Sequence, residues 1–139
     1  MGHMPHRIID RTAGNIRIVV EGRTPEELFA EAVRGLTDLM HPEADPGVAV
    51  AERELVIHAP DQTSLIVDFL KELLTDSYGR KEAVQDVTVR HLSGDCIEAD
   101  VRTVPAISFG EELKGVSYRE ADVHKRPDGM WETSLIFDV

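Results

Sequence analysis

The sequence is poor in cysteine, long apolar runs and aromatic residues, each of which would indicate a particular class of protein. Cys96 is the only cysteine among 139 residues, so an internal disulfide and a cysteine-based zinc cluster are both excluded. No apolar run approaches the roughly 18 residues that a membrane-spanning helix needs, and aromatic residues make up only 5% of the chain. The start of the sequence is short and polar and shows no secretory leader. We therefore expect a reducing, cytoplasmic setting and no association with a membrane.

Basic residues are also scarce. The chain has 15 Lys and Arg against 26 Asp and Glu, which gives a formal net charge of −11 at pH 7. A protein of this charge gains little from the counterion release that drives general nucleic-acid binding, so we expect no direct binding of RNA or DNA. If the protein acts on RNA, the charge favours action through a partner protein.

Length and composition favour one globular domain. Hydrophobic residues make up 42% of the chain and charged residues 29%, which is typical of a soluble globular protein. A chain of this length can bury a core without disulfides or metals. Residues 1–4 (Met-Gly-His-Met) have the pattern of a cloning scar, so we place the single domain at residues 5–139.

Two segments show the spacing and the capping residues of α-helices. The first begins at Thr24-Pro25-Glu26-Glu27, which has the residues of a capping box with a proline at the first helical position, and ends at His41-Pro42. The second runs from a cap at Asp61 to about Tyr78, where Gly79 is expected to stop it. The apolar stripe of the first helix is Leu28, Ala32, Val33, Leu36, Leu39 and Met40. That of the second is Leu65, Ile66, Phe69, Leu70, Leu73 and Leu74. Both stripes are expected to face the core.

The remaining segments alternate between apolar and polar residues, as strands do. This pattern predicts strands around residues 16–20, 55–59, 87–89 and 97–103. Two more, at residues 113–123 and 130–139, flank the turn sequence Arg126-Pro127-Asp128-Gly129 and predict a hairpin. The strands are grouped rather than alternating with helices. This favours an α+β two-layer sandwich, with a largely antiparallel sheet and two helices packed on one face.

Sequence motifs of catalysis are missing. The chain has no P-loop, no Gly-rich dinucleotide fingerprint and no G-x-S-x-G nucleophile elbow. Its six histidines show no pair at metal-ligand spacing, and Cys96 has no adjacent lysine or histidine to activate its thiol. The residues therefore disfavour an enzyme.

Two carboxylates meet at the end of the sequence. Asp138 follows the apolar Leu135-Ile136-Phe137 and shares its chain end with the α-carboxylate of Val139. Such groups on an ordered strand end repel each other unless a cation or hydrogen-bond donors compensate. Two interpretations stay open: a frayed end with both groups in water, or a site for a hard cation such as Ca²⁺ or Mg²⁺, which prefer oxygen ligands.

Several stretches, taken in order, resemble the archease family of small acidic proteins. Asp10-Arg11-Thr12-Ala13 resembles the family's opening Asp-His-Thr-Ala-Asp, and residues 22–29 resemble the start of its first helix. Residues 61–74 resemble its leucine-rich second helix. Residues 112–118 resemble its Glu-Val-Lys-Ala-Val-Thr-Tyr strand, and residues 136–139 resemble its ending Ile-Leu-Asp-Val. The matches keep their order over nearly the whole chain.

This resemblance implies a role in tRNA splicing. It implies that the protein activates an RtcB-type, GTP-dependent RNA ligase by promoting guanylylation of the ligase's active-site histidine and multiple turnover, and that it catalyses nothing itself. Two other roles stay open: a chaperone-like adaptor for a tRNA-modifying methyltransferase, and a divergent family member that lacks the metal site. The oligomeric state is left open as well.

The resemblance also implies a site for a divalent cation, Ca²⁺ or Mg²⁺/Mn²⁺. In the family, the aspartate that closes the opening motif, the penultimate aspartate and the chain terminus hold the metal. Asp138 and Val139 match the second half of this set. Gly14-Asn15 stands where the family has its first aspartate, which leaves Asn15 or Asp10 as the remaining candidate ligand. Because affinity for Ca²⁺ follows the number of charged ligands, the departure predicts a weakened site.

Three further residues are candidates for binding a partner. Lys114 and Tyr118 match the family pattern, with a solvated lysine and an ordinary sheet aromatic as the alternative interpretation. Arg11 replaces the usual histidine of the opening motif, and its guanidinium would supply a counter-charge if no cation is bound.

Overall fold

The computed structural model describes residues 5–45 and 50–139, so the predicted cloning scar lies outside the described residues. Two helices occur in this part of the chain, α1 (Pro25–Met40) and α2 (Gln62–Arg80). The strands are β1 (His6–Arg11), β2 (Asn15–Gly22), β3 (Glu43–Ala44), β4 (Ala51–His58), β5 (Glu82–Leu92), β6 (Cys96–Ser108), β7 (Gly115–Ser117), β8 (His124–Lys125) and β9 (Trp131–Asp138). Among the described residues, no helix is long and apolar enough to cross a membrane.

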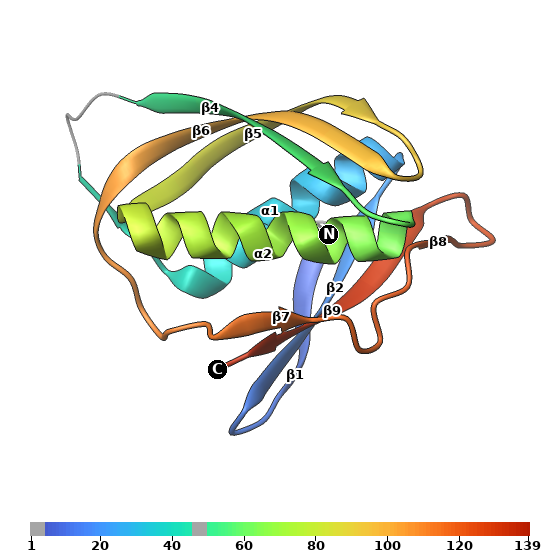
Figure 1. The fold of residues 1–139 in the computed structure, drawn as a ribbon. Coiled ribbons are helices and arrows are strands. Elements are labelled where there is room, and N and C mark those ends of the chain that lie inside the picture. Colours follow the sequence, from blue (N-terminus) through green and yellow to red (C-terminus); the bar gives the residue numbers. More distant parts are fainter. Residues whose placement is uncertain (1–4, 46–49) are drawn as a thin grey trace.

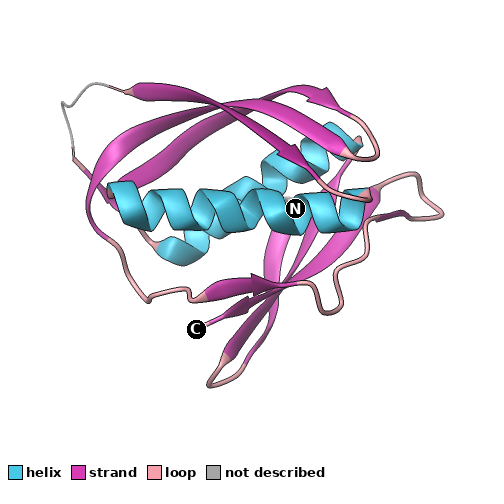
Figure 2. Cartoon of the chain, in the orientation of Figure 1, coloured by secondary structure: helices cyan, strands magenta, loops and turns pink. Residues whose placement is uncertain are grey.

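The strands form two antiparallel sheets, and the helices lie between them (Figures 1 and 2). The first sheet has the order β1-β2-β9-β7, with β8 also paired to β9. The second has the order β3-β6-β4, with β5 also paired to β6. Helix α1 contacts β2 and β5, and α2 contacts β7 and β4, so each helix touches both sheets. The predicted α+β class with two helices and antiparallel strands is confirmed, but the strands divide into two sheets rather than one.

Helix α2 explains this division, because it is apolar on more than one side. Every residue of both predicted helical stripes is buried. Val67, which lies outside the predicted stripe of α2, is also completely buried. A helix that is apolar around most of its circumference needs cover on both sides. The rings of Phe29 on α1 and Phe69 on α2, with centroids 6.3 Å apart, join the two helices in this core.

The helix starts agree with the capping residues, whereas one predicted stop is wrong. Thr24 Oγ1 accepts from the backbone N–H of Glu27 at 3.1 Å, and Asp61 Oδ1 accepts from that of Ser64 at 2.7 Å. Helix α2 continues past Gly79, and Lys81 adopts the left-handed conformation (φ 55°) that ends it. A glycine in the last turn is tolerated, and the stop falls where the chain turns into β5.

The segment before β9 departs from its predicted strand. Within residues 113–123 only β7 forms, and β8 follows directly after this stretch. Side chains of other elements accept hydrogen bonds from backbone N–H groups of this stretch, which are then not available for strand pairing. The N–H of Leu113 donates to the Tyr78 hydroxyl at 2.9 Å, and that of Val123 donates to Thr63 Oγ1 at 3.0 Å. The predicted hairpin is confirmed as β8–β9, with Gly129 at φ 89° in its turn. Strand β1 was not predicted.

Candidate functional site

The β1–β2 turn and the end of β9 lie side by side at one end of the strands of the first sheet. We call residues 11–15 together with Asp138 and Val139 the tip. Strand β9 lies between β2 and β7, and its register places Asn15 on one side of Asp138 and Gly115 on the other. Figure 1 shows the C-terminal end of the chain beside β7. The sheet therefore brings together two segments that are more than a hundred residues apart in the sequence.

Backbone hydrogen bonds fix the tip on both sides. The N–H of Val139 donates to the carbonyl of Gly14 at 3.1 Å, and the N–H of Lys114 donates to the carbonyl of Asp138 at 2.7 Å. Within the turn, the N–H of Thr12 donates to the carbonyl of Asn15 at 2.9 Å. A chain end bonded in this way is an ordered part of the sheet, which does not fit the frayed-end interpretation.

The side chain of Asn15 points toward Asp138. With its amide oriented to match its neighbours, Asn15 Nδ2 donates to Asp138 Oδ1 at 2.9 Å and to the Gly14 carbonyl at 3.1 Å. On the other side of Asp138, Gly115 has no side chain, and a Cβ added there would lie 3.6 Å from Asp138 Oδ2. The second carboxylate oxygen of Asp138 therefore faces a position that the sequence leaves bare.

The charged residues of the turn have partners other than Asp138. Asp10, a candidate ligand, accepts from the guanidinium of Arg17 at 3.1 Å. The same guanidinium also binds Glu120 at 2.7 Å. Arg11, the candidate counter-charge, donates to Glu111 at 2.8 Å. Asp10 and Arg11 are thus paired with Arg17 and Glu111, and among the candidate residues in the described part of the chain Asn15 is the one whose side chain bonds to Asp138.

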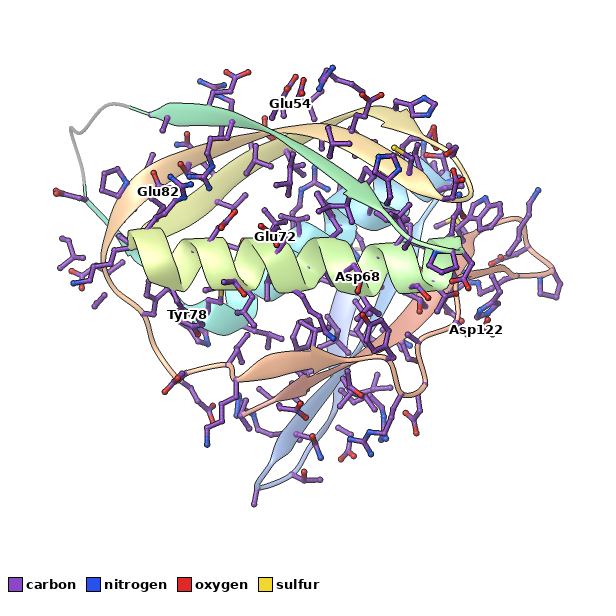
Figure 3. All side chains as sticks on the ribbon, viewed as in Figure 1. Glu54, Asp68, Glu72, Tyr78, Glu82 and Asp122 are labelled. Atoms are coloured by element: carbon purple, nitrogen blue, oxygen red, sulfur yellow. The ribbon has the colours of Figure 1, made fainter. Side chains whose placement is uncertain are left out.

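Lys114 and Tyr118 occupy different surroundings. Lys114 adjoins the tip through its backbone, and its side chain is exposed. Tyr118 is half exposed, with its hydroxyl bonded to Asp68 of α2 and Lys71 Nζ 4.0 Å from its ring centroid. Figure 3 shows Asp68 on α2. The hydrogen bond to Asp68, with burial and the charge of Asp68, raises the pKa of Tyr118. Tyr118 therefore belongs to the surface of α2 rather than to the tip.

A cluster around His6 was not predicted. Its ring binds Glu31 and Asp38 of α1, with Nε2 and Asp38 Oδ2 2.6 Å apart. Burial lowers the pKa of His6, but the hydrogen bonds and negative charges of Glu31 and Asp38 outweigh it and raise the pKa above its usual value of 6.5. No motif in the sequence links these residues, because Glu31 and Asp38 are 25 and 32 positions away from His6.

The described residues hold few of the usual metal ligands in one place. Within residues 5–45 and 50–139, no three side chains of His, Cys, Asp or Glu converge into a group that could hold a metal ion. What the tip offers instead is one fixed side-chain carboxylate, an amide and backbone groups. The fold and the tip define a class: small α+β proteins whose two helices lie between antiparallel sheets, with an ordered aspartate at the end of a central strand.

Comparison with known proteins identifies the family. The Archease protein family matches residues 6–139, and the chain belongs to this family. The protein archease of Methanosarcina barkeri is 26% identical over an alignment of 148 residues. The alignment covers 96% of this chain and 95% of that protein. The protein archease of Methanosarcina mazei is 26% identical over an alignment of 149 residues, with the same coverage of both proteins.

Two solved structures share the fold. The crystal structure of an archease from Thermotoga maritima, described as a possible chaperone, has a TM-score of 0.70 and 18% identity, and the match covers 100% of both chains. The solution structure of a Methanobacterium thermoautotrophicum protein has a TM-score of 0.69 and 20% identity, covering 97% of this chain and 99% of that one.

Proposed function

We propose that the protein is an accessory factor for an RtcB-type, GTP-dependent RNA ligase. In this role it promotes guanylylation of the ligase's active-site histidine and multiple turnover, and it catalyses no reaction itself. Membership of the archease family supports the proposal. The observation in this chain that carries it is Asp138, a carboxylate held on an ordered strand end with Oδ2 facing the bare position at Gly115.

The charge of the chain suits a basic partner. An acidic surface attracts a basic segment and steers its approach, and a carboxylate already held in place loses little freedom on binding. The backbone around Asp138 is bonded to Gly14 on one side and to Lys114 on the other. Asp138 would accordingly contact a basic segment of the ligase and help to position it for reaction with GTP.

A single-turnover measurement tests the proposal. The cognate ligase is mixed with labelled GTP, with and without this protein, and the covalent ligase–GMP adduct is followed in time. We expect the protein to speed adduct formation. An unchanged rate would contradict the proposed function.

The role of Asp138 is tested by Asp138→Asn. This substitution keeps an oxygen that accepts from the Asn15 amide but removes the negative charge, so we expect stimulation to fall while the Tm drops by only about 2–5 °C. Glu52→Gln is the matched control, because it removes one exposed charge from β4 in the other sheet. Equal losses in both variants would mean that total charge matters rather than Asp138.

A chaperone-like role is the second candidate, favoured by the description of the Thermotoga maritima relative as a possible chaperone. In this role the protein would act as an adaptor for a tRNA-modifying methyltransferase. Tagged protein and the Asp138→Asn variant are each used to capture partners from cells of the source. Recovery of a ligase that depends on Asp138 supports the first proposal, and recovery of a methyltransferase alone supports the second.

A further inference from the structure

Asn15 and Asp138 form a cross-strand pair, and one orientation of the Asn15 amide satisfies the oxygens that face it. The two Nδ2 hydrogens of Asn15 have two acceptors within reach, Asp138 Oδ1 at 2.9 Å and the Gly14 carbonyl at 3.1 Å. In the opposite orientation, the amide oxygen would lie against both of these oxygens at the same distances. Three oxygens so close together need a positive charge between them, whereas the NH₂ group satisfies them without one.

We propose that the Asn15 amide takes the place of a divalent cation at the tip, so that this family member closes its tip without Ca²⁺, Mg²⁺ or Mn²⁺. Two opposed carboxylates repel each other and need a cation to bring them together. A carboxylate opposite an amide donor is attracted to it, and a hydrogen bond to a charged group contributes more than a neutral one. In this chain Asn15 stands in place of the family aspartate opposite Asp138. The exchange removes one carboxylate ligand, and it also removes the repulsion between carboxylates that a metal ion would offset.

Asp138 Oδ2 and the terminal carboxylate of Val139 fall short of the ligand set that a metal ion prefers. Ca²⁺ prefers about six to eight oxygen ligands with several carboxylates among them, and Mg²⁺ needs a near-octahedral set. The Gly14 carbonyl already accepts from Val139 N–H at 3.1 Å and from the Asn15 amide at the same distance. A carbonyl oxygen has two lone pairs, so both are in use.

The neighbouring carboxylates are also engaged. Asp10 is paired with Arg17 at 3.1 Å, and Glu111 is paired with Arg11 at 2.8 Å. To gain a second side-chain carboxylate, a cation would have to break one of these ion pairs. Of the residues that the resemblance implied as ligands, Asn15, Asp10 and the Oδ1 atom of Asp138 are thus engaged in hydrogen bonds or ion pairs in this chain.

Thermal unfolding with and without cations tests the proposal and needs no ligase, so it stands apart from the proposed function. The unsubstituted protein is melted in EDTA and in millimolar Ca²⁺ or Mn²⁺, and binding is followed by titration calorimetry. We expect Tm values within about 1 °C of each other and no heat of binding. A cation-dependent rise in Tm, or a heat of binding that saturates, would overturn the proposal.

Asn15→Asp restores a second carboxylate opposite Asp138. We expect this variant to melt several degrees lower in EDTA and to regain stability with Ca²⁺ or Mn²⁺, because a ligand that binds only the folded state raises the Tm. Indifference of Asn15→Asp to both ions would show that Asn15 does not stand in for the cation.

The reciprocal variant controls for simple damage to the turn. Asn15→Asp combined with Asp138→Asn exchanges the amide and the carboxylate, so the hydrogen bond between residues 15 and 138 can form again. We expect its Tm in EDTA to return to within about 2 °C of the unsubstituted protein, with no response to cations. A double variant that still needs a cation would contradict the exchange of roles on which the proposal depends.

Discussion

Tyr118 joins the segment after β7 to helix α2 through two contacts of one side chain. Its hydroxyl bonds the carboxylate of Asp68, and the ammonium of Lys71 lies 4.0 Å from the centre of its ring. Asp68 and Lys71 are three residues apart, so they share one face of the helix. This spacing places both groups where a single aromatic ring reaches them.

The hydroxyl of Tyr118 should ionise at higher pH than a free tyrosine. The Asp68 hydrogen bond, burial and the charge of Asp68 all raise its pKa. A raised pKa in the fold means that the contact contributes fully below about pH 10 and is lost as the pH rises through the folded value. Absorbance titration of the unsubstituted protein and of Tyr118→Phe gives the Tyr118 curve by difference. A midpoint at or below about pH 10 would contradict the expectation.

Asp138 could be predicted as a site residue from the sequence, whereas the contacts of the other tip residues could not. Asp138 could be found because it breaks an apolar strand at a distinctive place. The partners of Asp10 and Arg11 could not, because Arg17 and Glu111 reach them only through strand register and a distant loop. The orientation of the Asn15 amide likewise depends on which atoms of β9 lie opposite it.

At the scale of elements, Gly22 at the junction between β2 and α1 makes the closest packing contact of any glycine in the described part of the chain. A Cβ added to Gly22 would lie 2.4 Å from the backbone nitrogen of Leu28 in the first turn of α1. We expect Gly22→Ala to lower the free energy of unfolding by about 1–3 kcal/mol or more, because a backbone atom cannot move aside as a side chain can. Urea denaturation measures this.

Gly79→Ala is the control of opposite sign. Gly79 lies in the last turn of α2, and a Cβ there would meet nothing within 4 Å. We expect this substitution to stabilise the protein by about 0.5–1 kcal/mol, because alanine loses less conformational freedom in a helix. Equal effects of the two substitutions would argue against the close approach at Gly22.

The packing of β1 against α1 should depend on pH through His6. Burial lowers its pKa, and the opposing effects of Glu31 and Asp38 raise it by more. Arg34, which binds Glu31 at 2.8 Å, and Asp86 of β5, which lines the same pocket as His6, also face this site. Since the folded pKa exceeds the unfolded one, the stabilisation is fully present below about pH 6.5 and is lost as the pH rises through the folded value.

His6→Gln keeps a polar side chain that does not titrate. The free energy of unfolding of the unsubstituted protein should fall more between about pH 6 and about pH 9 than that of the variant. Urea denaturation at both pH values gives the two differences, and the remaining histidines contribute equally to each. Identical differences would show that His6 does not carry the dependence.

Elements with local signals were predictable, and elements defined by distant partners were not. The caps at Thr24 and Asp61 and the apolar stripes depend on residues within a few positions, so both helices were found. Strand β1 gains its structure from pairing with β2, and its own residues are mostly exposed. The hydroxyls of Tyr78 and Thr63 interrupt the strand that alternation predicted at residues 113–123.

For the whole molecule, the charge of −11 should make partner binding sensitive to salt. Association through an acidic surface weakens as ions screen it, over a length of about 10 Å at 0.1 M salt. If the proposed ligase is the partner, we expect the affinity for it to fall several-fold between about 0.05 M and about 0.5 M NaCl, mostly through slower association. Surface plasmon resonance measures both rates. An affinity that is constant over this range would argue against an electrostatic contact.

The placement of β9 has a consequence for synthesis on the ribosome. This strand is central in the first sheet, with β2 and β7 on either side, yet among the described strands it is the last to be synthesised. Strands β2 and β7 therefore lack the partner that lies between them until the residues of β9 have left the ribosome. A chain that stops before residue 131 contains the residues of both helices but lacks the strand that joins β2 to β7, so the first sheet cannot close in a truncated product.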